Sequence, residues 1–300
     1  MFVLYRQLFS NEKIEIAYHH FILNFQGNYL LLIAVVVLMM LNWTIESIKW
    51  KLLIDKLHPV SWLDAIEGIL FGVTFSLFTP SRIGEFGGRI FALNTDRKEA
   101  IVSTLLGSIA QIVVNLTFGA LGLLLYSIMH HKIDQYLLFA FVFIYGLMVA
   151  AIHFVFYNID VVSTKFSNFS IFKKEYKYIH IIDLYSNKEF LILEILSTIR
   201  YVIYCLQFVL LLQFFGISMP FFVAFTVVAS IFFVQTINPF NIALIDFGFR
   251  GNVAAYFLSS FTGDAIAIIA TTVLLWFINL IIPAVIGGIA ALRFKFFREE

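Results

Sequence analysis

Five apolar segments of this chain are each long enough to cross the hydrocarbon core of a lipid bilayer. A helix needs about 20 apolar residues to span a core of about 30 Å. The runs that meet this length are 28–48, 100–128, 136–157, 189–215 and 264–291. Hydrophobic residues make up 61% of the chain and charged residues 13%, whereas soluble domains carry about 45–50% and about 25%. The sequence therefore predicts an all-α, polytopic helical bundle in a membrane.

Two further apolar segments are interrupted at a proline and then resume. In the first, the apolar run 62–78 breaks at Thr79-Pro80-Ser81 and a short helix follows at 83–93. In the second, the apolar run 219–237 breaks at Asn238-Pro239 and a helix follows at 242–259. Each predicts a helical hairpin, with Thr79 or Asn238 as N-cap and proline at the first helical position. Five crossings and two hairpins give about seven helical segments in all.

Lysine and arginine are unevenly distributed among the loops, and this distribution orients the chain. Basic residues lie after the first span, beginning with Lys49, and after the first hairpin. Others lie in the central loop and at the carboxyl end of the chain. The pattern predicts an outside amino terminus and opposite orientations for 28–128 and 189–291. These halves would form an inverted repeat, with 129–188 as connector. The charge rule does not separate re-entrant hairpins from pairs of full crossings, so both remain open.

The residues at either end of the chain are expected to flank a single transmembrane domain. Residues 1–27 mix apolar and charged groups and are predicted to be an interfacial segment. Residues 293–300 are basic and are predicted to be a cytoplasmic tail. The domain itself then spans 28–292.

Both interrupted segments carry an acid and an arginine four residues apart, which places the two side chains on one helix face. Ionisable groups inside membrane segments are costly and mark substrate paths by default. Arginine stays charged and binds phosphate in a fork geometry, and a helix N-terminus offers free N–H groups to an anion. The predicted substrate-binding residues are Arg82, Glu85, Arg89, Asp246 and Arg250.

Residues that start helices, allow close approach or form hydrogen bonds are expected to support this site. They are Pro80, Gly84, Gly87, Gly88, Asn238, Pro239, Gly248, Gly251, Gln111, Asn115, Glu194 and Arg200. A structural alternative remains open, in which the motifs are ion pairs and caps that pin the hairpins together. The pairs Gly84/Gly88 and Gly68/Gly72 have the spacing of helix contacts, which we expect them to be.

Several functional classes are disfavoured by the sequence. The net charge of +1 gives no basic excess for binding nucleic acid. The seven histidines do not have metal-ligand spacing, and no nucleotide-binding motif is present. We therefore expect no metal and no cofactor.

Asn279 and Pro283 are expected to interrupt the last span. The Lys-rich loop 165–188 is a candidate surface for a partner.

Two blocks of the sequence resemble a known family, the transmembrane region of lysylphosphatidylglycerol synthases, also called flippase-like domain proteins. The first block is Ile48–Leu53 followed by Thr79–Glu85, in which Lys49 and Ser81 replace the arginine and glycine of the usual form. The second block, Asn238–Gly251, is similar to the family's later Glu-x-Gly-x-Arg-Gly motif. The resemblance covers about residues 28–292.

The resemblance implies a multi-pass protein of the bacterial inner, or cytoplasmic, membrane. The best-understood members move aminoacylated phospholipid between leaflets. We therefore expect a lipid translocase, not an enzyme, whose partner is a phospholipid or a polyprenyl-phosphate-linked lipid. The alternatives are a membrane glycosyl- or aminoacyl-lipid transferase and an accessory subunit of a lipid-modifying synthase. Formation of a homo-oligomer remains open.

Overall fold

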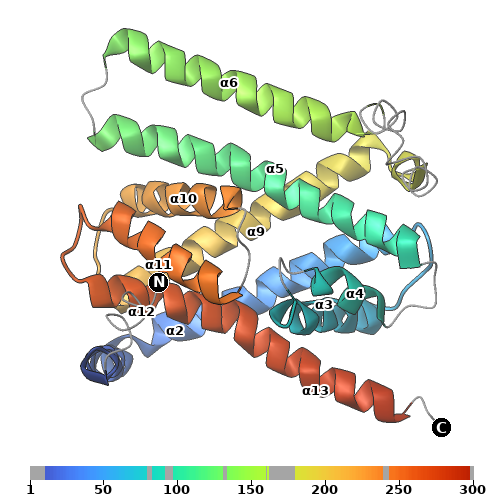
Figure 1. Cartoon of the computed structure of the whole chain (residues 1–300), viewed down its shortest axis with the longest axis horizontal. Helices are drawn as coiled ribbons and strands as arrows, with labels where there is room; N and C mark the ends of the chain where they lie inside the picture. The colour runs from blue at the N-terminus through green and yellow to red at the C-terminus, as the bar shows by residue number, and fades with distance from the viewer. Residues whose placement is uncertain are drawn as a thin grey trace.

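Figure 1 shows the computed structural model of the chain, which describes residues 11–79, 83–91, 97–130, 134–159, 161, 180–238 and 243–297. The principal elements in these residues are all helical. In chain order they are α2 (Asn11–Ile54), α3 (Trp62–Leu77), α4 (Gly84–Phe91), α5 (Arg97–His130), α6 (Gln135–Tyr157), the 3₁₀ turn η2 (His180–Leu184), α9 (Asn187–Phe214), α10 (Phe221–Ile237), α11 (Ala243–Leu258), α12 (Ala265–Trp276), the π-helical turn η3 (Phe277–Ile281) and α13 (Ile282–Phe297). The predicted all-α bundle is confirmed.

Five helical stretches in the described residues are long and apolar enough to cross a membrane. They are Gly27–Ile54, Lys98–His130, Gln135–Tyr157, Asn187–Phe214 and Ala265–Leu292. Each corresponds to one predicted span. The placement of Lys49 in a loop is wrong, because α2 continues to Ile54 and Lys49 is only 1% exposed.

The helix α2 changes direction at Asn28, whose backbone angles (φ −130°, ψ 22°) are not helical. This kink separates the apolar span from the helical residues that precede it. The kink falls at the predicted boundary between the N-terminal segment and the transmembrane domain. The interfacial location of the N-terminal segment stays a prediction.

The first hairpin is built from α3 and α4, which pack directly against each other. A side chain at either Gly84 or Gly88 would collide with the backbone of α3. A Cβ at Gly84 would lie 2.4 Å from the carbonyl oxygen of Phe75, and a Cβ at Gly88 would lie 2.5 Å from that of Phe71. These glycines therefore lie at a helix contact, in agreement with their spacing. At the break, Thr79 Oγ1 accepts a hydrogen bond from the backbone N–H of Gly84 at 2.7 Å.

The helices of the two halves pack in matching pairs. α2 and α9 lie against each other in the middle of the bundle (Figure 1). α3 packs on α4 and on α13, while α10 packs on α11 and on α5. Likewise α4 contacts α5, and α11 contacts α12. Each hairpin is thus held by a long helix from the other half of the chain.

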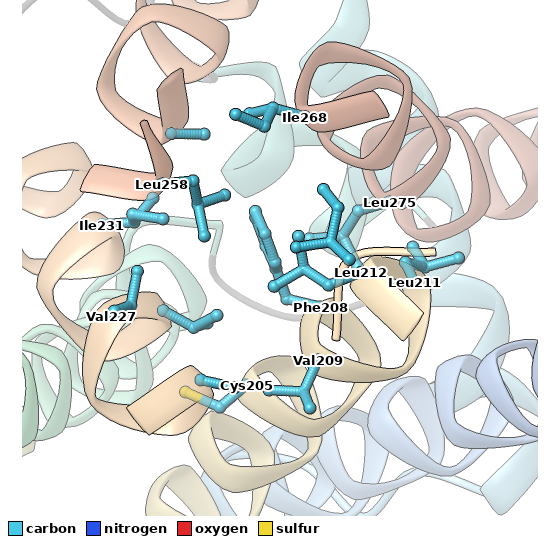
Figure 2. Packing of buried hydrophobic residues seen from close by; sticks show 14 of the residues in the cluster. Cys205, Phe208, Val209, Leu211, Leu212, Val227, Ile231, Leu258, Ile268 and Leu275 are labelled. Carbon is cyan, nitrogen blue, oxygen red and sulfur yellow. The ribbon is translucent and has the colours of Figure 1, made fainter. Parts of the chain in front are cut away.

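The largest apolar core joins α9 to α10, α11 and α12. In Figure 2 the Phe208 ring lies between side chains of these helices, among them Ile231, Leu258 and Leu275. Phe208 is fully buried. Since the second hairpin contributes to this core, its helices are fixed to α9 by packing of side chains.

The helix α6 lies at the edge of the bundle, alongside α5 (Figure 1). Phe156 is the one residue of α6 whose side chain is buried among the described residues. Most of the apolar surface of α6 is therefore left to face lipid.

Candidate functional site

A buried carboxylate, Glu46 of α2, gathers three basic side chains from three helices. Its Oε1 lies 2.8 Å from Arg89 NH1 of α4, and its Oε2 lies 2.9 Å from Lys49 Nζ. The same Oε2 also pairs with Arg200 NH1 of α9. Glu46 is 3% exposed. With Glu85, which pairs with Arg89, these residues form what we call the Glu46 cluster: Glu46, Lys49, Glu85, Arg89 and Arg200.

The first hairpin delivers Arg89 to this cluster. Arg89 is 3% exposed and lies between the carboxylates of Glu46 and Glu85. Its side chain passes over Gly72 of α3, where a Cβ atom would come within 2.7 Å of Arg89 Cγ. The small residue on α3 therefore makes room for the guanidinium to reach α2.

Arg200 connects the cluster to α2 and α5. Its Nε donates to Asn42 Oδ1 at 2.7 Å, and its NH1 donates to Gln111 Oε1 at 3.3 Å. The guanidinium also lies 5.8 Å from the centre of the Trp43 ring. Lys49 Nζ donates to Ser197 Oγ at 3.4 Å, also on α9. The cluster thus fastens α2, α4, α5 and α9 to one another.

The Glu46 cluster has more positive charge than negative charge. Its three basic and two acidic side chains give a formal net charge of +1. Two buried donors have no hydrogen-bond acceptor among the described residues, namely Arg89 Nε and Asn42 Nδ2. An uncompensated charge and unpaired donors are costly in a buried site. The arrangement is therefore suited to an anion that accepts hydrogen bonds.

A series of polar side chains leads from the cluster to the second hairpin. Gln111 Nε2 donates to Asn115 Oδ1 at 3.0 Å on α5, and Asn115 Nδ2 donates to Thr236 Oγ1 of α10 at 3.4 Å. The neighbouring Gln235 accepts a hydrogen bond from Arg250 NH1 of α11 at 3.4 Å. We call these residues the polar track, which extends from Gln111, a partner of Arg200, to Thr236 and the adjacent Gln235, a partner of Arg250.

The predicted site residues fall into three groups. Glu85, Arg89 and Arg200 meet in the Glu46 cluster, while Gln111, Asn115 and Arg250 belong to the polar track. Glu194 lies elsewhere and contacts α6. Arg82, Pro80, Pro239 and the side chain of Asp246 lie outside the described residues.

The smaller predicted residues are placed as follows. Asn238, predicted as an N-cap, lies at the C-terminal cap of α10, where its N–H donates to Gln235 O. An added Cβ at Gly87, Gly248 or Gly251 would meet no atom of the described residues within 4 Å. Within the part of the chain that the structure describes, these three glycines therefore lack the kind of helix contact seen at Gly84 and Gly88.

Sequence reasoning did not identify Glu46, the centre of the cluster, or its neighbour Asn42. Glu46 lies three residues before Lys49 within the first span, and an acid and a base at this spacing lie on one helix face. That pairing inside an apolar run is the pattern that indicates a buried charged site.

The last span is interrupted at the expected residues. Pro283 has no N–H for the carbonyl of Asn279, four residues earlier, and the helix forms the π-helical turn η3 there. Trp43 Nε1 instead donates to the Asn279 carbonyl at 3.2 Å. Trp43 therefore joins the interrupted span to the Glu46 cluster through its contact with Arg200.

Replacing Trp43 with Phe is expected to lower the free energy of unfolding by about 1 kcal/mol, because the Asn279 carbonyl loses its donor. Thermal unfolding of the purified protein in detergent measures the change. Trp62→Phe is the matched control, since Trp62 is largely exposed and surface substitutions usually stay within about 0.5 kcal/mol. Equal stability of the two variants would contradict the role given to Trp43.

Residues 24–282 match the family described as Lysylphosphatidylglycerol synthase TM region. The chain belongs to this family. Comparison with curated proteins and with solved structures gave no match. The matched residues contain the whole Glu46 cluster, the polar track and both hairpins.

Membership of the lysylphosphatidylglycerol synthase TM family identifies a multi-pass membrane protein related to lipid synthesis or flipping. The first block of the resemblance contributes Lys49 to the Glu46 cluster, and Trp50 is the next residue. Trp50 is 1% exposed, and its Nε1 donates to Thr104 Oγ1 of α5 at 3.1 Å. Lys49 and Trp50 therefore have direct structural partners on α9 and α5.

Proposed function

We propose that the protein binds the phosphate of a membrane lipid at the Glu46 cluster and moves that lipid between the two leaflets. The observation that carries this proposal is the buried surplus of positive charge, together with the unpaired Nε of Arg89. A phosphate supplies negative charge and several acceptor oxygens, and arginine binds it in a fork geometry. Because the chain belongs to a protein family related to lipid synthesis or flipping, a lipid headgroup is the natural source of that phosphate.

Glu85 is the partner that the headgroup displaces. The side chain of Glu85 is 20% exposed, whereas those of Glu46 and Arg89 are each 4% exposed. Glu46 is also held by Lys49 and Arg200 and therefore stays in place. Exchange of the Glu85 carboxylate for a phosphate keeps Arg89 paired throughout, so the guanidinium is never left buried without an anion.

The polar track is the path by which the headgroup leaves the cluster. Its amide and hydroxyl groups offer hydrogen bonds between Arg200 at one end and Arg250 at the other. Polar groups inside a membrane bundle commonly line substrate pathways. In this proposal Arg250 receives the phosphate, and the predicted role of Asp246 as its counter-charge remains part of the proposal.

The matched packing of the two halves supports an inverted repeat over 28–128 and 189–291. When the two halves are exchanged, the contact of α3 with α13 corresponds to the contact of α10 with α5. In the same way, the contact of α4 with α5 corresponds to that of α11 with α12. Inverted repeats place substrate near the midplane, at broken helices. The distribution of loop lysines and arginines supplies the opposite orientations.

The first hairpin is re-entrant in this proposal. With 8 residues, α4 is about 12 Å long at 1.5 Å per residue. A helix of that length crosses less than half of a core of about 30 Å. The Glu46 cluster then lies inside the membrane, where the hairpin turns back.

The substrate is an anionic or aminoacylated phospholipid, or a polyprenyl-phosphate-linked lipid, of a bacterial inner membrane. All three offer the phosphate that the cluster can bind. An aminoacylated headgroup adds a cation, for which the carboxylate of Glu85 is a counter-charge next to Arg89. The lipid gradient itself drives net movement in the simplest form of the proposal.

The test is exchange of fluorescent phospholipid between the leaflets of proteoliposomes. We expect Arg89→Gln and Arg250→Gln each to lower the exchange rate at least about tenfold, the equivalent of about 1.4 kcal/mol. Lys56→Gln is the control, because Lys56 pairs with Glu189 at the surface of the described structure. This variant should retain the wild-type rate.

Gel filtration of each variant separates loss of transport from loss of fold. If both arginine variants fold and exchange lipid at the wild-type rate, the site assignment is wrong. If the wild type retains phospholipid in native mass spectrometry but does not exchange it, the protein is a lipid-binding accessory subunit and not a translocase.

A further inference from the structure

A second group of ionisable side chains joins the peripheral helix α6 to α9. Glu194 of α9 contacts two residues of α6: its Oε1 lies 2.9 Å from His153 Nε2, and its Oε2 accepts a hydrogen bond from the Tyr157 hydroxyl at 2.5 Å. Glu194 lies seven residues after the first residue of α9, about 10 Å along the helix. The group is distinct from the Glu46 cluster, since Arg200 of the same helix pairs with α2.

The geometry of His153 determines how many protons this group holds. His153 Nδ1 lies 2.9 Å from the carbonyl oxygen of Val149, which only accepts hydrogen bonds, so Nδ1 carries a hydrogen. Nε2 then faces Glu194 Oε1. A bare ring nitrogen and a carboxylate oxygen are both acceptors, and their contact requires one more hydrogen between them. Together, His153 and Glu194 therefore hold one proton more than a neutral histidine and an ionised glutamate would hold.

Among the described residues, the charged side chains on the elements near this pair include Asp183 of η2 and Lys188 and Glu189 of α9. Tyr157 is the titratable group of α6 in contact with Glu194. On α5, which packs against both α6 and α9, there is no acidic, basic or tyrosine side chain between Glu99 and Tyr126. At the start of α9, Glu189 is paired with Lys56 at 2.7 Å.

The attachment of α6 to α9 depends on few contacts in the described residues. The Phe156 and Tyr157 rings pack against Phe190 of α9, with ring centres 5.2 Å and 6.2 Å away. Ile152 of α6 packs against the same apolar cluster, which also contains Leu193 of α9, and Glu194 contacts both His153 and Tyr157. Loss of the shared proton leaves two acceptors facing each other and removes the hydrogen bond between His153 and Glu194, whereas the Tyr157 hydroxyl still donates to Glu194.

We propose that His153 and Glu194 form a binding site for a single proton, and that the bound proton holds α6 against α9. This site lies outside the Glu46 cluster and the polar track, and its argument does not depend on lipid transport. Ionisable pairs inside membrane helices commonly carry protons. When the proton leaves, the contact of α6 with α9 is weakened to the Tyr157 hydrogen bond and the packing of the rings on Phe190.

Nitrogen NMR of the protein with 15N-labelled histidine, reconstituted in lipid, tests the proton directly. We expect His153 to have both ring nitrogens protonated, or else infrared spectra to show a protonated Glu194. The His153→Gln and Glu194→Gln variants assign the two signals. In Glu194→Gln the His153 ring is expected to have a single protonated nitrogen, because the glutamine amide can donate to Nε2.

His130 is a matched control within the chain. Its Nδ1 faces the carbonyl of Tyr126, four residues earlier, at 3.1 Å, as His153 faces Val149. The ring of His130 stacks on Tyr126 instead of meeting a carboxylate. If the His153 ring gives the same nitrogen signals as His130 and Glu194 is ionised, the proton site is absent and the proposal fails.

Spin labels on α6 and α9 test the second half of the proposal. With labels at Leu147 and Ile199, both exposed, the distance distribution of the wild type should broaden at a pH where NMR shows that the proton has left. In Glu194→Gln the amide donates to a neutral ring without an added proton, so the distribution should not change with pH. A wild-type distribution that stays the same after deprotonation would refute the coupling to α6.

Discussion

Replacement of Glu46 by glutamine is expected to lower the free energy of unfolding by about 3–5 kcal/mol, the cost of leaving buried charges without their partner. Glutamine has nearly the same shape but carries no charge. Arg200 and Lys49 would then be buried without a carboxylate, and Arg89 would keep only Glu85. Thermal and denaturant unfolding in detergent micelles measures the loss.

Two further variants separate this effect from a general effect of removing acids. Glu189→Gln removes the partially exposed partner of Lys56 and should cost at most about 1 kcal/mol. The double variant Glu46→Gln, Lys49→Gln removes one of the uncompensated cations and should recover part of the stability. If Glu46→Gln unfolds at the wild-type temperature, Glu46 does not hold the three basic side chains together.

The spans of the fold could be predicted because they depend on local composition. A membrane helix needs a long apolar run, and the five runs in the sequence correspond to the five long apolar helices. Their ends were less accurate. The span before Lys49 was expected to end at residue 48 because a lysine is normally a loop residue, whereas Glu46 and Ser197 give Lys49 partners inside the bundle.

The site could be predicted only where its residues lie on one helix. Glu85 and Arg89 are four residues apart, so their pairing follows from helix geometry. The contacts of Arg89 with Glu46 and of Arg200 with Asn42 join different helices, and sequence spacing does not specify such pairs. Glu194 illustrates the same limit, because its partner His153 is 41 residues away on another helix.

The structural and the functional interpretations of the first motif concern the same atoms. An ion pair that only pins two helices is best balanced in charge, since an excess of buried charge is costly. The Glu46 cluster instead has one more base than acids, and Arg89 Nε has no acceptor among the described residues. In the proposed function the pin and the anion site coexist: Glu46 holds the helices together, and the headgroup phosphate replaces Glu85 as a partner of Arg89.

Replacement of Gly88 by alanine is expected to disturb both the hairpin and the cluster. The new Cβ would lie 2.5 Å from the carbonyl oxygen of Phe71 and 2.7 Å from its carbonyl carbon. Backbone atoms cannot rotate away as a side chain can, so α4 must move from α3. Overpacking of this kind costs about 1–3 kcal/mol. Arg89 is the next residue, so the same movement pulls its guanidinium away from Glu46.

The neighbouring glycine provides the control for this variant. At Gly87 no described atom lies within 4 Å of an added Cβ, and alanine in a helix is favoured over glycine by about 1 kcal/mol. Gly87→Ala should therefore unfold at the wild-type temperature or slightly above it, whereas Gly88→Ala unfolds earlier. Because both changes add one methyl group to α4, a difference between them reports the contact with α3. Equal stability of the two variants would show that α3 and α4 are not packed at the distance that carries Arg89 to Glu46.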